Sequence, residues 1–175
     1  MTIPANNWSV TLNEIERRIC AWVGKQRRQY AVNSGRNPGL GPSRLDECGA
    51  ENDIRGAECE YAASRILNLY WRPWVGSITE AKRMRDVGGL IEVRSTDLPN
   101  GRLIVKPDDP DDAPFVLIVR NADRFTLAGW LFAHEAKEFH LLTAYGDPAH
   151  FVPQDKLSAN TLLIEWISGC LMESA

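Results

Sequence analysis

The chain has 175 residues, of which 44% are hydrophobic and 25% charged, and 20 Lys and Arg residues against 23 Asp and Glu residues give a net charge of −3. This composition is typical of one globular domain, and the charge excludes a nucleic-acid affinity supplied by bulk positive charge, so that any such binding must be local. With no run of about 18 apolar residues and no leader pattern, we expect neither a membrane span nor a signal peptide.

Apolar residues recur at helical spacing from Thr11 to Tyr30 and predict an amphipathic helix whose opposite face carries arginines. The expected apolar stripe, with one polar position, comprises Leu12, Ile15, Ile19, Trp22, Val23, Gln26 and Tyr30. The helix is basic, and its cations form either a solvated face or an arm that contacts nucleic-acid phosphates. The candidate phosphate contacts are Arg17, Arg18, Lys25, Arg27 and Arg28.

A Gly- and Pro-rich interval over residues 34–49 predicts a flexible connection. We therefore expect three parts: the basic helix with this connection (1–50), a core (51–153) and a C-terminal helix that packs on the core (154–175). Four cysteines without a C-x-x-C pair favour a reduced, cytoplasmic protein.

The core begins with a predicted helix over residues 52–71, ended by Pro73, after which the apolar period becomes that of strands. Short turns predict that successive strands are antiparallel neighbours. The predicted strands are 87–96, 102–106, 115–119, 125–132 and 150–152, with helices at 134–139 and 160–172. This order predicts an α/β (α+β) fold with a central mixed sheet flanked by helices.

One stretch carries candidate chemistry, Asp86-Val-Gly-Gly-Leu-Ile-Glu92-Val-Arg94. Glu92 and Arg94 are two apart on a strand and share a face, and the two glycines let the chain bend so that Asp86 returns toward Glu92. Two carboxylates placed in this way suit a hard cation such as Mg²⁺. Glu60, in Gly56-x-x-x-Glu60 on the preceding helix, lies at the edge of the buried stripe and offers a third acid.

These motifs resemble the PD-(D/E)xK nuclease superfamily, over about residues 52–132, and in particular its small phage and bacterial members. The resemblance implies a restriction-endonuclease-like sheet and a Mg²⁺ (or Mn²⁺) ion held by Asp86, Glu92 and the Val93 carbonyl. It also implies that Glu60 orients a water or a second ion, and that a cation steadies the scissile phosphate of DNA.

This sequence has Arg94 where the superfamily usually has lysine, and an arginine cannot serve as a general base. Either Arg94 stabilises charge, with Lys106 reaching in from a paired strand as a relocated lysine, or the site has lost activity and kept a binding role. The first prediction is a Mg²⁺-dependent DNA nuclease.

The alternative is an inactive nuclease-like fold that binds DNA or a host protein, for example as a phage inhibitor. Residues 107–155, with nine acidic against three basic side chains, would then face a basic partner. A homodimer is left open.

Overall fold

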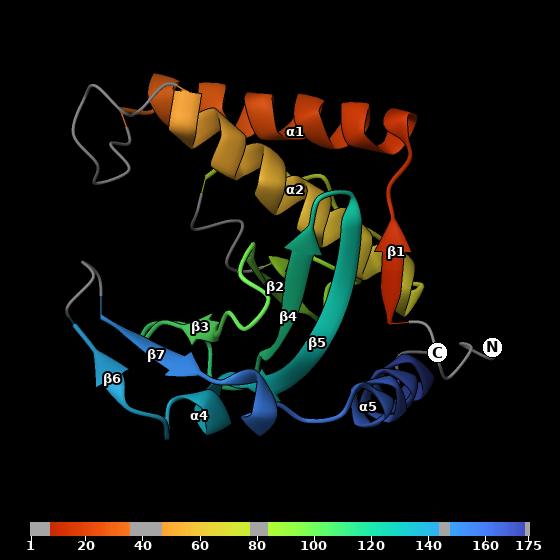
Figure 1. The fold of residues 1–175 in the computed structure, drawn as a ribbon, viewed down its shortest axis with the longest axis vertical. Helices are drawn as coiled ribbons and strands as arrows, with labels where there is room; N and C mark the ends of the chain where they lie inside the picture. Colours follow the sequence, from red (N-terminus) through yellow and green to blue (C-terminus); the bar gives the residue numbers. More distant parts are fainter. Residues whose placement is uncertain (1–7, 36–46, 78–83, 144–147, 174–175) are drawn as a thin grey trace.

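The computed structural model describes residues 8–35, 47–77, 84–143 and 148–173 (Figure 1). The elements in chain order are β1 (Ser9–Thr11), α1 (Glu14–Asn33), α2 (Glu47–Leu67), β2 (Glu92–Thr96), β3 (Leu103–Val105), β4 (Pro114–Asn121), β5 (Arg124–Phe132), α4 (Ala133–Ala136), β6 (Leu141–Leu142), β7 (Ala149–Val152), the 3₁₀ turn η2 (Gln154–Lys156) and α5 (Asn160–Glu173). No helix in these ranges is long and apolar enough to cross a membrane. Most of the predicted flexible connection, residues 36–46, lies outside them.

The predicted α+β fold with a mixed sheet is confirmed. The main sheet has the order β1-β5-β4-β2, in which β2 and β4 are parallel and the other pairs antiparallel, and a second antiparallel sheet has the order β3-β7-β6. The central strand β4 is buried on both faces. Its Val116 and Ile118 pack toward α2 and α5, and its Phe115 and Leu117 pack toward the second sheet and α4 (Figure 1).

The predicted antiparallel pairing of successive strands holds for β4 and β5 but is wrong for β2 with β3 and for β3 with β4. β2 pairs in parallel with β4, and β3 pairs with β7 in the other sheet. The six residues 97–102 between the two strands include a turn closed by the Gly101 N–H and the Leu98 carbonyl, and this turn does not bring the strands into one ladder. The edge strands β1 and β6, of three and two residues, have no counterpart among the predicted strands.

The helix predicted over 52–71 spans Glu47–Leu67 instead, because Asn68 takes a left-handed conformation (φ 51°) and ends it before Pro73. The strand predicted from Val87 is also shorter. Val87 and Ile91 bridge across a tight turn that contains two glycines with positive φ, so the regular strand begins only at Glu92. Trp71, expected at the end of the helix, instead bridges to Val87.

The N-terminal helix α1 begins after a capping box, in which Asn13 and Glu16 each accept a hydrogen bond from the other's backbone N–H. The prediction that its apolar stripe is buried is correct for Leu12 and Val23 but wrong for most of the stripe. The exposed members, with their exposed fractions, are Ile15 (70%), Trp22 (61%), Ile19 (47%) and Tyr30 (40%).

The face of α1 that packs on α2 is built from small residues and ion pairs. Cys20, Gly24 and Ala31 are buried there, and a Cβ on Gly24 would lie 2.5 Å from the Ile54 Cα, so only glycine allows this approach. Charged residues of this face pair with α2, as in Arg28 with Asp53. Close backbone packing and ion pairing therefore decide which face is buried, in place of the hydrophobic period.

This orientation of α1 predicts that substitutions at two adjacent residues change the free energy of unfolding by very different amounts. Val23→Ala should lower the free energy of unfolding by about 1–3 kcal/mol because it opens a gap under α1, whereas Trp22→Ala, though it removes a larger side chain, should change it by less than about 0.5 kcal/mol. Urea denaturation measures both. A larger loss for Trp22→Ala would mean that the apolar stripe is the packed face.

Candidate functional site

The turn between Val87 and Ile91 brings Asp86 back to the strand that carries Glu92. The backbone N–H groups of Asp86 and Val87 both donate to the Ile91 carbonyl, and one Asp86 carboxylate oxygen accepts the Val93 N–H at 2.8 Å. The expected return of Asp86 toward β2 is therefore confirmed in its geometry. The two carboxylates lie on either side of this turn, at the start of β2.

The electrostatics show that these carboxylates share one environment. Burial raises the pKa of Asp86 well above its usual value, and the charges of Glu60 and Glu92 raise it further. Burial also raises the pKa of Glu92, although Arg94 and then Arg85 act to lower it. Burial thus disfavours the charged form of both carboxylates, and the nearby arginines do not fully offset this effect.

Two arginines flank Glu92. Arg94 donates to an Asp109 carboxylate oxygen at 3.0 Å, lies 4.6 Å above the Phe115 ring and is 3.9 Å from the Glu92 carboxylate. Arg85 lies 3.5 Å from the other Glu92 oxygen. Arg94 is therefore held in a fixed position at the edge of the carboxylate pair.

Glu60 lies on the buried side of α2, as predicted, with 8% of its surface exposed. Its two carboxylate oxygens accept from Arg27 at 2.6 and 2.7 Å, and one of them also accepts the Trp71 indole N–H at 3.1 Å. Its charge reaches Asp86 and raises the pKa of that group. A role of Glu60 in orienting a water or a second ion stays a prediction, and it requires that Arg27 move aside.

Lys106 follows β3 and does not lie on a strand paired with β2. Its backbone N–H donates to the Asp109 oxygen that also binds Arg94, at 2.8 Å, which places it next to the site. Its side chain lines a neighbouring cavity. Its role as a relocated lysine stays a prediction.

The five cations proposed as a phosphate-binding arm do not form one surface. Arg27 and Arg28 face α2, where they pair with Glu60 and Asp53. Arg17 lies 3.9 Å from Asp123 and is partly exposed. Arg18 and Lys25 are exposed, and Arg18 pairs with Glu14 of its own helix. Of the five cations, only Arg17, Arg18 and Lys25 are therefore placed to contact a phosphate from solution.

Two members of the site were missed by the sequence analysis. Asp109 is buried, yet it lies in a turn with three other aspartates that the sequence cannot tell apart. Arg85 directly precedes Asp86 and has a left-handed backbone (φ 50°), which turns its side chain to Glu92 and Asp112. Its position beside the motif is the one signal that pointed to it.

Within the part of the chain that the structure describes, no group of three or more His, Cys, Asp and Glu side chains is arranged to hold a metal ion. The pair of Asp86 and Glu92 still fits Mg²⁺, which in proteins is commonly held by one or two carboxylates and completed by water and substrate phosphate. Burial raises the pKa of both groups, and a divalent cation beside them would favour their charged forms.

No family model, curated protein or solved structure matches the chain. Its function must therefore be inferred from the geometry of this site.

Proposed function

We propose that the protein is a divalent-metal-dependent DNA phosphodiesterase of the PD-(D/E)xK type, with Mg²⁺ or Mn²⁺ bound by Asp86 and Glu92. The observation that carries the proposal is the convergence of these two largely buried carboxylates, whose pKa values burial raises, beside a fixed arginine. Carboxyl groups whose pKa values are shifted by burial beside specific charged partners are typical of functional sites. The α+β fold with a mixed sheet supports the same assignment.

Each residue of the site has a distinct role in this proposal. The Val93 N–H orients the Asp86 carboxylate, and Glu92, one residue earlier, presents the second ligand. The Val93 carbonyl would be a third ligand; in this structure it accepts a hydrogen bond from Arg94 at 3.3 Å. A bound metal ion supplies an activated water and neutralises charge on the phosphate. Arg94 remains a cation at every relevant pH, so it stabilises phosphate charge and does not remove a proton.

A second candidate function, binding of DNA without cleavage, is favoured by one observation. Arg94 is paired with Asp109, so its positive charge is partly neutralised within the protein and stabilises a phosphate less. A basic protein partner is less well supported, because Asp111 and Asp112 of the acidic segment pair with Lys137 and Arg85.

Cleavage assays separate the two functions. Linear, circular and branched DNA are incubated with the protein and about 5–10 mM Mg²⁺ or Mn²⁺. We expect cleavage that EDTA abolishes and that Asp86→Ala and Glu92→Ala each slow by at least about a hundredfold, because loss of a ligand exceeds the 10–100-fold effect of losing an outer contact. Asp155→Ala, at an exposed aspartate paired with Lys156, is the matched control and should leave the rate unchanged.

Cleavage that persists in both site variants would disprove the assignment of the site. DNA binding without cleavage in either metal would leave the second function.

A further inference from the structure

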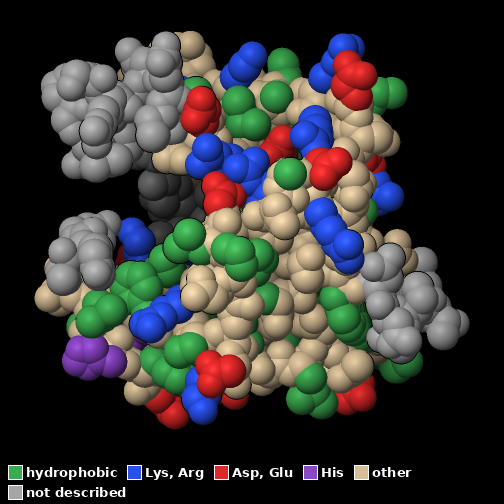
Figure 2. Space-filling model, viewed as in Figure 1, with side chains coloured by type: hydrophobic (Ala, Val, Ile, Leu, Met, Phe, Trp, Pro, Cys, Tyr) green, Lys and Arg blue, Asp and Glu red, His purple; other side chains and the backbone are tan. Residues whose placement is uncertain are grey.

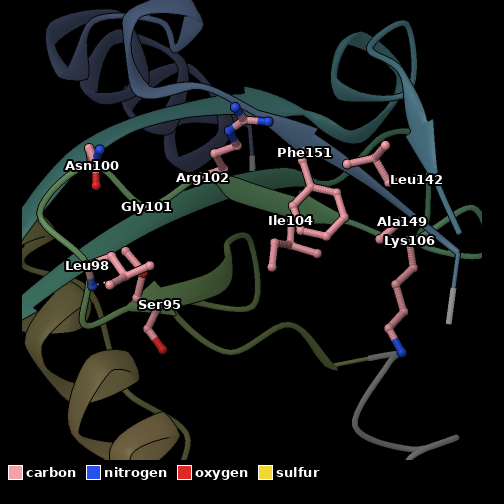
Figure 3. Close-up of a pocket in the computed structure, with 11 residues that line it drawn as sticks. Ser95, Leu98, Asn100, Gly101, Arg102, Ile104, Lys106, Leu142, Ala149 and Phe151 are labelled. Carbon is pink, nitrogen blue, oxygen red and sulfur yellow. Dashed lines mark hydrogen bonds between the residues drawn. The ribbon is translucent and has the colours of Figure 1, made fainter. Parts of the chain in front are cut away.

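A groove of about 750 Å³ lies between the end of β2 and the outer face of the β3-β7-β6 sheet (Figure 3). One wall includes Thr96, and the other is formed by side chains of β3 and β7. Figure 2 shows hydrophobic and basic side chains side by side on the surface over these strands. Of the site residues described above, only Lys106 lines this groove.

The wall formed by β3 has a simple pattern. Ile104 of β3 and the residues that flank the strand, Arg102 and Lys106, alternate along the chain and line the groove, while Leu103 and Val105 are buried in the core on the opposite face. Ile104 is the register partner of Phe151 on β7, so the aromatic ring lies beside the middle of this row. Four residues of strand place the two cations about 13 Å apart with the apolar centre between them.

The chemistry of the lining indicates its ligand. Among the residues that the structure describes, those that line the groove include two cations and no Asp or Glu, together with an aromatic ring, aliphatic side chains and the Asn100 amide. Cations on either side of an aromatic platform are the arrangement by which proteins hold a nucleic-acid strand, with phosphates on the cations and a base on the ring.

We propose that this groove binds an unpaired DNA strand, with phosphates at Arg102 and Lys106 and a base against Phe151 and Ile104. The strand is unpaired because the face of a base is available to an aromatic ring only where the base is not stacked in a duplex. The proposal thus names the form of DNA that the protein accepts.

One end of the groove is linked to the arginine beside the carboxylate pair. Thr96 lies two residues after Arg94 on the same face of β2, and the Lys106 N–H shares the Asp109 oxygen that binds Arg94. A strand along β3 therefore has its Lys106 end near Arg94, which lies 3.9 Å from the Glu92 carboxylate. This step rests on the proposed function, whereas binding in the groove needs no metal.

Fluorescence anisotropy in EDTA tests the binding alone. The probes are a labelled oligothymidylate of about a dozen nucleotides and a hairpin duplex of the same sequence class. We expect the single strand to bind at least about tenfold more tightly than the duplex. Phe151→Leu, which keeps an apolar side chain and removes the ring, should weaken single-strand binding about tenfold and leave its salt dependence unchanged.

The two cations should behave differently from the ring. Arg102→Ala and Lys106→Ala should each lower the slope of log affinity against log salt by about 0.7, because each loses one phosphate contact to a single strand. Lys156→Ala, an exposed cation outside the groove, is the matched control and should leave the slope unchanged. Circular dichroism of each variant verifies that it is folded.

The result that would overturn the groove is equal affinity for both probes, or folded Phe151→Leu and Arg102→Ala variants that bind as the wild type does. Its failure is distinguishable from that of the proposed function. If cleavage depends on the metal but the groove variants bind DNA as the wild type does, the proposed strand-binding role of the groove is wrong and the nuclease function stands. If the groove variants weaken DNA binding but no DNA is cleaved in Mg²⁺ or Mn²⁺, the strand-binding role of the groove stands and the nuclease function is wrong.

Discussion

Arg27→Met is expected to lower the free energy of unfolding by about 3 kcal/mol, because it leaves the Glu60 carboxylate without its cation. Arg27 binds both oxygens of Glu60, and the side chains of Arg27 and Glu60 are 21% and 11% exposed. Removal of one partner from such a pair leaves a largely desolvated charge, which costs more than the pair itself contributed. Arg27 also donates to the Trp74 carbonyl, so the variant loses a contact that fixes the segment after α2.

The matched control is Arg18→Met on the same helix. Arg18 pairs with Glu14 four residues away, and both side chains are more than three-quarters exposed. Pairs of this kind contribute little, so we expect a change below about 0.5 kcal/mol. Urea denaturation compares the two variants. Equal and small losses would show that Arg27 is free to serve as a phosphate contact and that α1 is not held to α2 through Glu60.

Asp86→Asn is expected to stabilise the metal-free protein at neutral pH by a few degrees in melting temperature and to abolish stabilisation by Mn²⁺. The folded state raises the pKa of Asp86 above its unfolded value, so the folded state binds the proton more tightly. Stability is therefore greatest below the unfolded pKa near 3.8 and is lost as pH rises through the higher folded pKa. Asparagine removes this loss and keeps an oxygen for the Val93 N–H.

Differential scanning fluorimetry with and without Mn²⁺ measures both effects. In the wild type, Mn²⁺ at about a hundred times its dissociation constant should add about 2.7 kcal/mol, and in Asp86→Asn this gain should vanish. Asp155→Asn, at an exposed aspartate, should change neither value. An Asp86→Asn protein that is less stable than the wild type in EDTA, and still stabilised by Mn²⁺, would show that Asp86 is structural.

The sequence predicted those elements whose apolar pattern matches their burial. The run that became β4 is apolar throughout and lies buried in the middle of the sheet, and α5 lies almost where its period predicts. The period failed for α1, because Gly24 and the ion pairs with α2 select a face that is not the most apolar one. Strand order also failed, since no local pattern shows that β3 joins a different sheet from β2.

The candidate site likewise has parts that the sequence predicts and parts that depend on tertiary contacts. The return of Asp86 to β2 was predictable because two adjacent glycines permit the turn, and both have positive φ. The partners of the site were not predictable, because Asp109 and Arg27 reach it from distant parts of the chain. The groove is likewise a product of tertiary structure, formed by the outer face of a sheet whose strands are separated in sequence.

Anomalous scattering from crystals grown with Mn²⁺ is the most direct test of a metal-dependent site. We predict a peak between the carboxylates of Asp86 and Glu92, with metal–oxygen distances near about 2.1 Å to both, as hard cations of this size require. The peak should disappear in crystals of Asp86→Asn grown under the same conditions. A folded wild-type protein that shows no peak there at about 10 mM Mn²⁺, or shows one only elsewhere, would contradict the assignment.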